Sequence, residues 1–307
     1  MSASGRCVSF NERMRLDVPD EVRRRVVADG NAGWFDHLPS VVDSLKRDWS
    51  LTIGATLRGG VNALVVEVTL ADGTAAVLKV GVPGTRSELG FEAAVLRLAD
   101  GEGCAQLFRD DLDRDALLLE RLGASLYDVV PDAATRRDML CDVAARLWRP
   151  VGPEVDLPTG ADRAHRYADL LPRLWQETGR ACSQETVEDA LACIERRRRA
   201  VLVHGDLHEL NALQAADGTF KLVDPDGLRA EPAYDLGTIV RCNPDSADDL
   251  RARAQRLAAR TGVDVTAIWE WGTVHRVVSG LFSRRIGFQP FGDLLLAEAD
   301  RLTARAD

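Results

Sequence analysis

One stretch in the second half of the chain constrains its fold more than any other. The apolar segment 201–203 reads as a strand, and residues 204–211, His-Gly-Asp-Leu-His-Glu-Leu-Asn, follow it as a tight polar loop. A later apolar segment, 220–223, reads as a strand that runs directly into the acidic turn Asp224-Pro-Asp226. The pattern therefore predicts short strands whose connecting loops carry carboxylates and an amide.

Three of these polar residues suit phosphoryl transfer from ATP. Asp206 stands five positions before Asn211, and Asp224 follows the second strand. In this reaction a base orients the attacking hydroxyl, while an amide and a carboxylate hold Mg²⁺ on the nucleotide phosphates. Mg²⁺ needs few protein oxygens besides phosphates and waters, so two ligands suffice. We therefore interpret Asp206 as the base and the other two residues as metal ligands, with the Asp-to-Asn spacing of the protein-kinase catalytic loop.

Four neighbouring residues are interpreted as supports of these loops. The Gly-Asp between His204 and His208 predicts a loop rather than a helix, which argues against a zinc pair. We expect His204 to hold the loop by hydrogen bonds and His208 to shape it or to face a phosphate. Asp226 either reaches a second metal or stabilises the turn. Asp235 is expected to cap the next helix, to hydrogen-bond the catalytic loop, or both.

The first half of the chain predicts a small α+β lobe. Helical periodicity near 18–27 and 34–49 gives way to strand-like patterns at 51–57, 64–70, 75–80, 104–108 and 116–120, with a helix at 87–99. Lys79 lies among apolar residues of the third strand, where a lone ammonium needs a partner. We interpret it as a clamp on the α/β-phosphates held by Glu92, with Glu88 as second candidate. The alternative is an exposed lysine on an edge strand.

Two further segments of this lobe are candidates for nucleotide contacts. The turn containing Gly59, Gly60 and Asn62 lets backbone approach a polyphosphate, although a double glycine in a hairpin is often only a turn. The extended segment from Leu117 to Leu122, which includes Glu120, is expected either to bind an adenine edge or to serve as a core strand and linker.

Composition limits the classes of function. The 307 residues carry a net charge of −9, which argues against binding a nucleic-acid backbone. An acidic surface favours a cationic small molecule, but it also serves solubility. No apolar stretch has the length of a membrane span, and the first residues lack the apolar core of a secretory signal. We therefore expect a cytoplasmic protein with no membrane partner, and we favour a monomer.

The motifs resemble those of the aminoglycoside phosphotransferase family of the protein-kinase-like fold. The resemblance rests on His204–Asn211, on Val223-Asp-Pro-Asp-Gly and on Tyr234-Asp235-Leu, and it is strongest to the streptomycin 6-kinase and hydroxyurea phosphotransferase branch. It implies a bilobal α+β fold, with an antiparallel nucleotide-binding lobe over 1–121, including a helical leader, and a mostly helical catalytic and acceptor-binding lobe over 122–307. It also implies ATP, Mg²⁺ and O-phosphorylation that inactivates a drug.

The expected acceptor is a cationic aminoglycoside or aminocyclitol, with the 6-hydroxyl of streptomycin first. Alternatives are hydroxyurea, a metabolic acceptor such as an amino sugar, a homoserine-like or a choline-like compound, and a pseudokinase that only binds. Acidic residues that could hold the acceptor's cations, or could be ordinary surface charge, are Glu209, Asp245, Asp248 and Asp249. His208-Glu209 departs from the two histidines frequent in this branch, which leaves the acceptor open. The weak glycine signature leaves GTP open as a donor.

Overall fold

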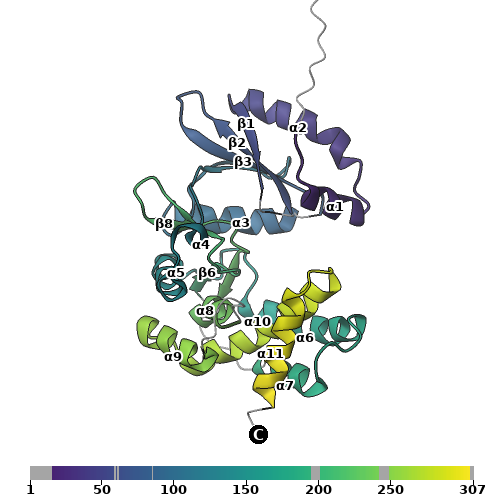
Figure 1. The fold of residues 1–307 in the computed structure, drawn as a ribbon. Coiled ribbons are helices and arrows are strands. Elements are labelled where there is room, and N and C mark those ends of the chain that lie inside the picture. Colours follow the sequence, from purple (N-terminus) through teal and green to yellow (C-terminus); the bar gives the residue numbers. More distant parts are fainter. Residues whose placement is uncertain are drawn as a thin grey trace, which may run out of the picture. The chain divides into compact units, whose positions relative to one another are not determined.

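The structure is a computed structural model that describes residues 16–58, 60, 62–84, 86–194, 201–241 and 249–304. The chain divides into two compact units (Figure 1). The first unit contains the described residues up to Leu89 together with Phe108–Arg121, and the second contains Gly90–Leu107 and the chain from Leu122 onward. Helix α3 (Arg86–Ala99) begins in the first unit and continues in the second.

The first unit is a five-stranded sheet covered by two helices. The strands have the order β1-β2-β3-β5-β4, and α1 (Asp20–Ala28) and α2 (Trp34–Asp48) precede them. The strands are β1 (Thr52–Leu57), β2 (Ala63–Thr69), β3 (Ala75–Gly81), β4 (Leu107–Asp111) and β5 (Ala116–Glu120). Apolar residues of both helices form one core with side chains of β2, β3 and β5. The helical leader thereby covers a face of the sheet that would otherwise expose its apolar side chains to water.

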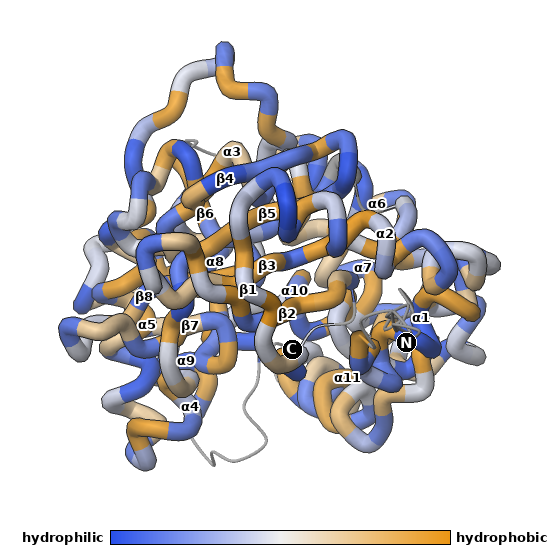
Figure 2. The backbone as a smooth tube through the Cα atoms, turned by 90° about the horizontal axis from the view of Figure 1, so that it is seen from above, coloured by the Kyte–Doolittle hydropathy of each residue, from blue (hydrophilic) through white to orange (hydrophobic). Residues whose placement is uncertain are grey.

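Local sequence explains the centre of this sheet. Asp72-Gly73 turns the chain between β2 and β3, since Gly73 has a φ of +88° and Asp72 accepts a hydrogen bond of 2.9 Å from the Thr74 amide. β5 is apolar from Ala116 until it ends at Glu120 (Figure 2), and it pairs with β3 in the buried middle of the sheet.

The strand expected at 104–108 is wrong in position. β4 begins only at Leu107, because Cys104 and Ala105 are buried in a different contact. Cys104 forms an isolated parallel bridge with Leu222, and the Ala105 amide donates to the Leu222 carbonyl at 2.9 Å. The apolar residues that suggested a strand are thus packed within the second unit.

The second unit is mostly helical and contains two short antiparallel pairs of strands. Its helices after α3 are α4 (Leu126–Val129), α5 (Ala133–Leu147), α6 (Gly160–Glu177), α7 (Gln184–Ile194), α8 (Pro232–Arg241), α9 (Leu250–Thr261), α10 (Val265–Arg285) and α11 (Phe291–Thr303). α10 is buried along most of its length and packs against α6, α7, α8, α9 and α11. α4 is a four-residue helix that the sequence analysis did not predict, whereas α8 is the helix expected next to Asp235. α7 ends at Ile194, and residues 195–200 lie outside the described residues.

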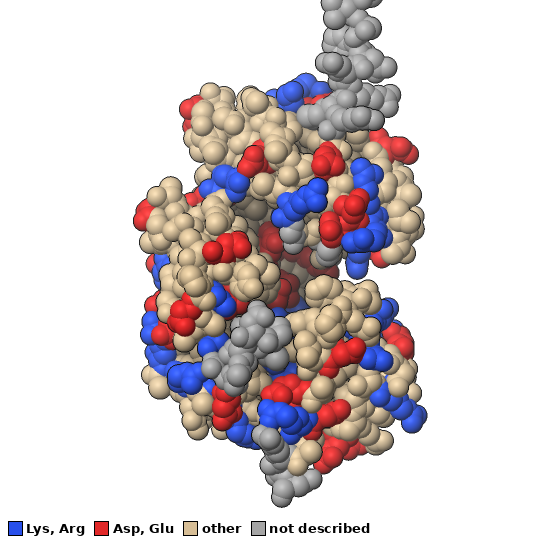
Figure 3. Space-filling view, in the orientation of Figure 1, with Lys and Arg blue, Asp and Glu red and all other residues tan. Residues whose placement is uncertain are grey.

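Surface charge is mixed in the part of the chain that the structure describes. On the face drawn in Figure 3, lysines and arginines are interspersed with aspartates and glutamates over both units. None of the helices among these residues combines the length and apolar character needed to cross a bilayer.

Candidate active site

Two loops of the second unit carry the motif residues. β6 (Val201–Val203) pairs with β9 (Leu228–Ala230), and β7 (Ala212–Gln214) pairs with β8 (Phe220–Leu222). Residues 204–211, called here the histidine loop, connect β6 to β7, and residues 223–227, the acidic loop, connect β8 to β9. Because the four strands form two antiparallel pairs, both loops leave the same ends of these pairs.

His204 joins the two loops. Its ring is fully buried, its Nε2 lies 2.8 Å from the Val223 carbonyl oxygen, and the Asp206 amide donates to its Nδ1 at 3.3 Å. The ring therefore carries its proton on Nε2 and donates it to Val223. The His204 carbonyl in turn accepts from the Asp226 amide at 2.8 Å. One side chain and its own backbone thus fix the histidine loop against the acidic loop.

Asp235 of α8 (Pro232–Arg241) anchors the histidine loop through its backbone amides. Its carboxylate is fully buried and accepts hydrogen bonds of 2.9 Å from the amides of His204 and Gly205 and from Trp148 Nε1. Burial raises the pKa of Asp235, while the hydrogen bonds from these three donors oppose that rise. α8 begins at Pro232, so Asp235 lies inside the first turn and does not cap this helix. Its hydrogen bonds go to the loop instead.

Asp206 projects from the histidine loop as a carboxylate. Its side chain is 45% exposed, and its Oδ2 lies 3.3 Å from His208 Nε2. Partial burial opposes ionisation of Asp206, but the hydrogen bond and charge of His208, with the charge of Arg241, hold the pKa of Asp206 below the usual range. An exposed, ionised carboxylate on a rigid loop is suited to accept a hydrogen bond from an incoming hydroxyl.

Asn211 and Asp224 lie at the same end of the β7–β8 pair. Ala212 pairs with Leu222, and one residue further the Val223 amide donates to the Asn211 carbonyl at 2.9 Å. Asn211 Nδ2 donates to the Asp206 carbonyl at 3.1 Å, so the side-chain oxygen of Asn211 points away from that carbonyl. Asp224 is exposed and has a φ of +57°, a left-handed conformation that is costly for a residue other than glycine.

The Asn211 amide and the Asp224 carboxylate would fit Mg²⁺ as a pair of oxygen ligands. An amide and a carboxylate suit a hard cation that takes its other ligands from phosphates and water. No group of three or more His, Cys, Asp or Glu residues suited to a metal occurs among the described residues, so a site built wholly from protein ligands, as for structural zinc, finds no support there.

Two glycines permit the close packing of the acidic loop. Gly205 has a φ of +92°, and a Cβ there would lie 2.6 Å from Asp226 Cβ. Gly227 has a φ of +64°, and a Cβ there would lie 2.5 Å from Phe91 Cβ on α3. α3 is therefore held against the acidic loop, and the neighbouring Glu92 is 5% exposed in the same unit.

The first unit carries most of the residues predicted to bind the nucleotide, and Glu92 and Leu122 belong to the second unit. Lys79 is 9% exposed on β3, paired with Val65 on one side and Leu117 on the other. β3 lies between β2 and β5, so the alternative of an exposed edge-strand lysine is wrong. Glu92 belongs to the second unit, and the pairing of Lys79 with Glu92 or Glu88 stays a prediction.

The other predicted nucleotide contacts lie at the ends of strands. The Asn62 carbonyl accepts from the Val82 amide at 3.0 Å, directly before β2, while Gly60 is described beside it and Gly59 lies outside the described residues. Glu120 is the last residue of β5, and Leu122 is 4% exposed at the point where the chain returns to the second unit.

The acidic residues proposed for acceptor binding have structural contacts where they are described. Glu209 Oε1 lies 3.2 Å from Arg136 Nε, and the two side chains are 20% and 6% exposed. Asp249 caps α9 by accepting from the Arg251 amide at 2.9 Å. Asp245 and Asp248 lie outside the described residues. Glu209 therefore fixes the histidine loop to α5, whatever it does for an acceptor.

Sequence reasoning missed two side chains that hold these loops. Trp148 donates to Asp235 from beyond the end of α5, and Arg163 Nη1 of α6 lies 3.1 Å from Asp226 Oδ2. Both stand tens of residues before their partners in the chain. Neither belongs to a local motif, so only the tertiary structure reveals them.

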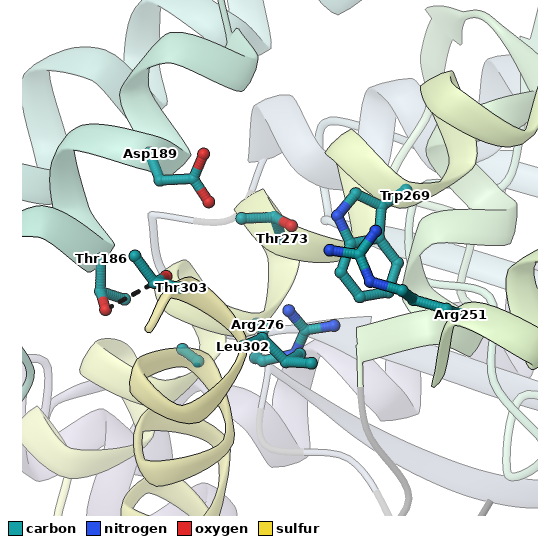
Figure 4. A pocket seen from close by; sticks show the side chains of 9 residues that line it. Thr186, Asp189, Arg251, Trp269, Thr273, Arg276, Leu302 and Thr303 are labelled. Carbon is teal, nitrogen blue, oxygen red and sulfur yellow. Dashed lines mark hydrogen bonds between the residues drawn. The ribbon is translucent and has the colours of Figure 1, made fainter. Parts of the chain in front are cut away.

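A small cavity of about 90 Å³ lies among α7, α9, α10 and α11 (Figure 4). In it Arg251 stacks on the Trp269 ring at 4.2 Å from the ring centroid, and Arg276 extends beside Thr273. Arg276 also donates to the carbonyls of Val240 and Arg241, at 3.1 and 2.8 Å. None of the predicted site residues lines the cavity. Arg276, which does line it, holds the end of α8 through these two hydrogen bonds.

Comparison with known proteins identifies the family. The profile of the aminoglycoside/hydroxyurea antibiotic resistance kinases matches residues 48–287. A streptomycin 6-kinase of Streptomyces glaucescens is 30% identical over 217 residues, 69% of each chain. A hydroxyurea phosphotransferase of Kitasatospora aureofaciens is 30% identical over 267 residues, 84% of this chain and 76% of that protein.

Solved structures identify the fold. Aminoglycoside phosphotransferase APH(4)-Ia, in a ternary complex with ADP and hygromycin B, superimposes with a TM-score of 0.61 over 86% of this chain and 98% of its own, at 16% identity. The α+β protein-kinase-like fold and the family resemblance predicted from the sequence are both confirmed. The chain is a phosphotransferase, and it belongs to the family of aminoglycoside/hydroxyurea antibiotic resistance kinases.

Proposed function

We propose that the chain transfers the γ-phosphoryl group of ATP to a hydroxyl of a cationic aminoglycoside, with the 6-hydroxyl of streptomycin as acceptor. The observation that carries the proposal is the fixed arrangement of Asp206, Asn211 and Asp224 on two loops joined by His204. A protein that only binds nucleotide has no need for both a base and metal ligands. The similarity to streptomycin 6-kinase and the net charge of −9 favour a cationic acceptor.

In this reaction Asp206 orients the acceptor hydroxyl and accepts its proton late, since the transition state of phosphoryl transfer is loose. Asn211 and Asp224 would hold Mg²⁺, which when bound neutralises charge on the nucleotide phosphates. His208 keeps the Asp206 carboxylate ionised and oriented through their 3.3 Å contact. Asp235 and His204 keep the base on a rigid backbone, and Asp226 supports the acidic loop through Arg163.

The nucleotide is assigned to the first unit and to the segment that follows it. We propose that Lys79, held by Glu92, binds the α- and β-phosphates. The turn with Gly59, Gly60 and Asn62 covers the phosphates, and the segment from Glu120 to Leu122 binds the adenine edge. In this division residues 1–121 bind the nucleotide, and residues 122–307 hold the base and the acceptor. Glu209, Asp245, Asp248 and Asp249 remain the acidic candidates for the acceptor's cations.

Hydroxyurea is the second candidate acceptor. The match to a hydroxyurea phosphotransferase covers 84% of this chain, whereas the match to the streptomycin 6-kinase of S. glaucescens covers 69%, both at 30% identity. The two acceptors share a hydroxyl but differ in charge and size. The loops described here suit either, because Asp206 needs only a hydroxyl within hydrogen-bond reach.

The test is an acceptor panel read by mass spectrometry. The protein is incubated with ATP and Mg²⁺ and with streptomycin, other aminoglycosides, hydroxyurea, an amino sugar, homoserine or choline. A mass gain of one phosphate on streptomycin, placed at the 6-hydroxyl by NMR, supports the proposal. Phosphate on hydroxyurea alone supports the second candidate, and phosphate on none of them overturns both. Replacing ATP by GTP in the same panel identifies the donor.

The variant Asp206→Ala tests whether the base acts as assigned. We expect turnover to fall by roughly 100- to 10,000-fold, the contribution of a positioned base, while nucleotide binding persists. Asp217→Ala is the matched control, because Asp217 lies at the other end of the β7–β8 pair and only caps its turn through Thr219. Undiminished turnover in Asp206→Ala would remove this residue from the mechanism.

A further inference from the structure

The small cavity among α7, α9, α10 and α11 has polar side chains on several of its walls (Figure 4). Its volume of about 90 Å³ is several times the roughly 10–15 Å³ that one water needs, so it has room for a small ligand. All four helices belong to the second unit, so the cavity does not depend on the placement of the other unit. The histidine loop and the acidic loop do not line it, so an inference about the cavity stands apart from the proposed function.

One face of α10 supplies the buried wall of this cavity. Trp269, Thr273 and Arg276 follow one another at spacings of four and three residues, which places them on the same side of the helix. Thr273 is 6% exposed, and its hydroxyl forms no hydrogen bond with any residue that the structure describes. Burying a hydroxyl without a partner is costly. A polar ligand in the cavity would supply the partner that Thr273 lacks, next to the guanidinium of Arg276.

Arg251 of α9 brings a second guanidinium to the same wall. It stacks on the Trp269 ring at 4.2 Å from the ring centroid, and the guanidinium of Arg276 lies 5.6 Å from the centroid of the same ring. The exposed side chain of Arg251 has neither a hydrogen-bond acceptor nor an ion-pair partner in the described part of the chain. Stacking uses only the face of a guanidinium, so the N–H groups at its edge stay available for an oxyanion. Two like charges held beside one ring also favour an anion near them.

Asp189 of α7 faces this wall from the other side of the cavity (Figure 4). It is exposed, and its carboxylate forms no ion pair within the described ranges. An ionised carboxylate accepts hydrogen bonds and cannot donate them. A ligand that touches both walls therefore needs a hydrogen-bond donor for Asp189, and an anion that only accepts, such as sulfate, would be repelled there.

We propose that the cavity binds a small oxyanion that also carries a hydrogen-bond donor. Inorganic phosphate, which keeps a P–OH group at neutral pH, and a small amino acid such as glycine share this chemistry. The oxyanion accepts from the guanidinium of Arg251 and from the hydroxyl of Thr273, beside the charge of Arg276. The P–OH group or the ammonium group donates to Asp189 on the opposite wall.

The experiment is equilibrium dialysis of the full chain against radiolabelled phosphate, glycine or sulfate, at constant ionic strength and without Mg²⁺ or nucleotide. Charged hydrogen bonds predict that phosphate or glycine binds with a Kd of about 1 mM or below, and that sulfate binds roughly tenfold more weakly. Arg251→Ala should raise the Kd of the bound anion roughly 10- to 100-fold, and Thr273→Val roughly 3- to 10-fold. Arg260→Ala is the matched control, because it removes the same charge from α9 at a surface pair with Asp142.

Each outcome decides for or against the site. Absence of saturable binding of both phosphate and glycine overturns the inference, and so does an equal Kd in Arg251→Ala and Arg260→Ala, because the anion would then bind elsewhere. Sulfate that binds as tightly as phosphate overturns the requirement for a donor, whereas a gain in sulfate affinity in Asp189→Asn supports it. Thermal unfolding of each variant identifies a folding defect. If the buried change Thr273→Val prevents folding, the exposed change Arg251→Ala decides.

Discussion

Replacing Asp235 tests how much of the site's rigidity depends on one buried carboxylate. In Asp235→Ala, three donors now at 2.9 Å, Trp148 Nε1 and the amides of His204 and Gly205, lose their acceptor in a fully buried place. At about 1–3 kcal/mol for each unsatisfied donor, the loss is about 3–9 kcal/mol, a large part of the stability of a typical domain. In Asp235→Asn the amide oxygen can keep the bonds that Oδ2 now accepts. The NH₂ group of the new asparagine then faces the Gly205 amide, so we expect the free energy of unfolding to fall by about 1–3 kcal/mol.

The assay is urea unfolding followed by tryptophan fluorescence, together with kcat on the identified acceptor. Asp249→Ala is the matched control, because Asp249 also accepts a backbone hydrogen bond beside a helix but only as a cap on α9. Loss of such a cap costs about 0.5–2 kcal/mol. We expect Asp235→Ala to lose several times more free energy of unfolding than Asp249→Ala, with Asp235→Asn in between. Equal losses at the two positions would refute the assignment of Asp235 as the anchor of the histidine loop.

Three other measurements test separate features of the structure. Asp224→Ala should raise the Mg²⁺ concentration for half-maximal turnover by about tenfold or more, while Asp217→Ala leaves it unchanged; no shift would exclude Asp224 as a ligand. Gly227→Ala should lower the free energy of unfolding by about 1–3 kcal/mol more than Gly218→Ala does. Both glycines have a positive φ, but only a Cβ at position 227 would meet another side chain, at 2.5 Å. Equal losses of stability in thermal unfolding would contradict this expectation. Burial lowers the pKa of His275 to about 3, so below pH about 6.5 the unfolded chain binds a proton that the folded chain does not. Folding free energy is therefore lost as pH falls from about 6.5 to about 3, by up to about 4–5 kcal/mol, and His275→Asn should flatten that slope; an unchanged slope would show that His275 is not held neutral.

Local sequence patterns were sufficient to predict the positions of site residues that belong to one motif. The spacing of Asp206 and Asn211 and the apolar strand before Asp224 predicted that the three residues converge. The structure has Asn211 and Asp224 at the same end of the β7–β8 pair, because an antiparallel pair of strands returns the chain to its starting end, and the roles of the three side chains stay a prediction. The buried position of Lys79 also followed from its apolar neighbours on β3.

Contacts made by distant residues could not be predicted in this way. Glu209 reads as a free acidic residue beside the motif, but Arg136 from α5 binds it at 3.2 Å. The segment at Cys104 reads as a strand because it is apolar, yet it is buried against Leu222. In both cases the side chain suits two environments, and the choice depends on which element packs against it. Local sequence does not contain that information.

Asp226 illustrates how the structure decides between interpretations that the sequence left open. As a second metal ligand it would need its carboxylate directed to a cation, whereas its Oδ2 lies 3.1 Å from Arg163 Nη1 and its amide donates to the His204 carbonyl. A guanidinium and a divalent cation repel each other, so the charge of Arg163 disfavours a metal ion on the same carboxylate oxygen. Arg163 is only 16% exposed and would have to leave its position for a metal to bind there. The contacts therefore favour the second interpretation, in which Asp226 stabilises the turn and links α6 to the loop that carries Asp224.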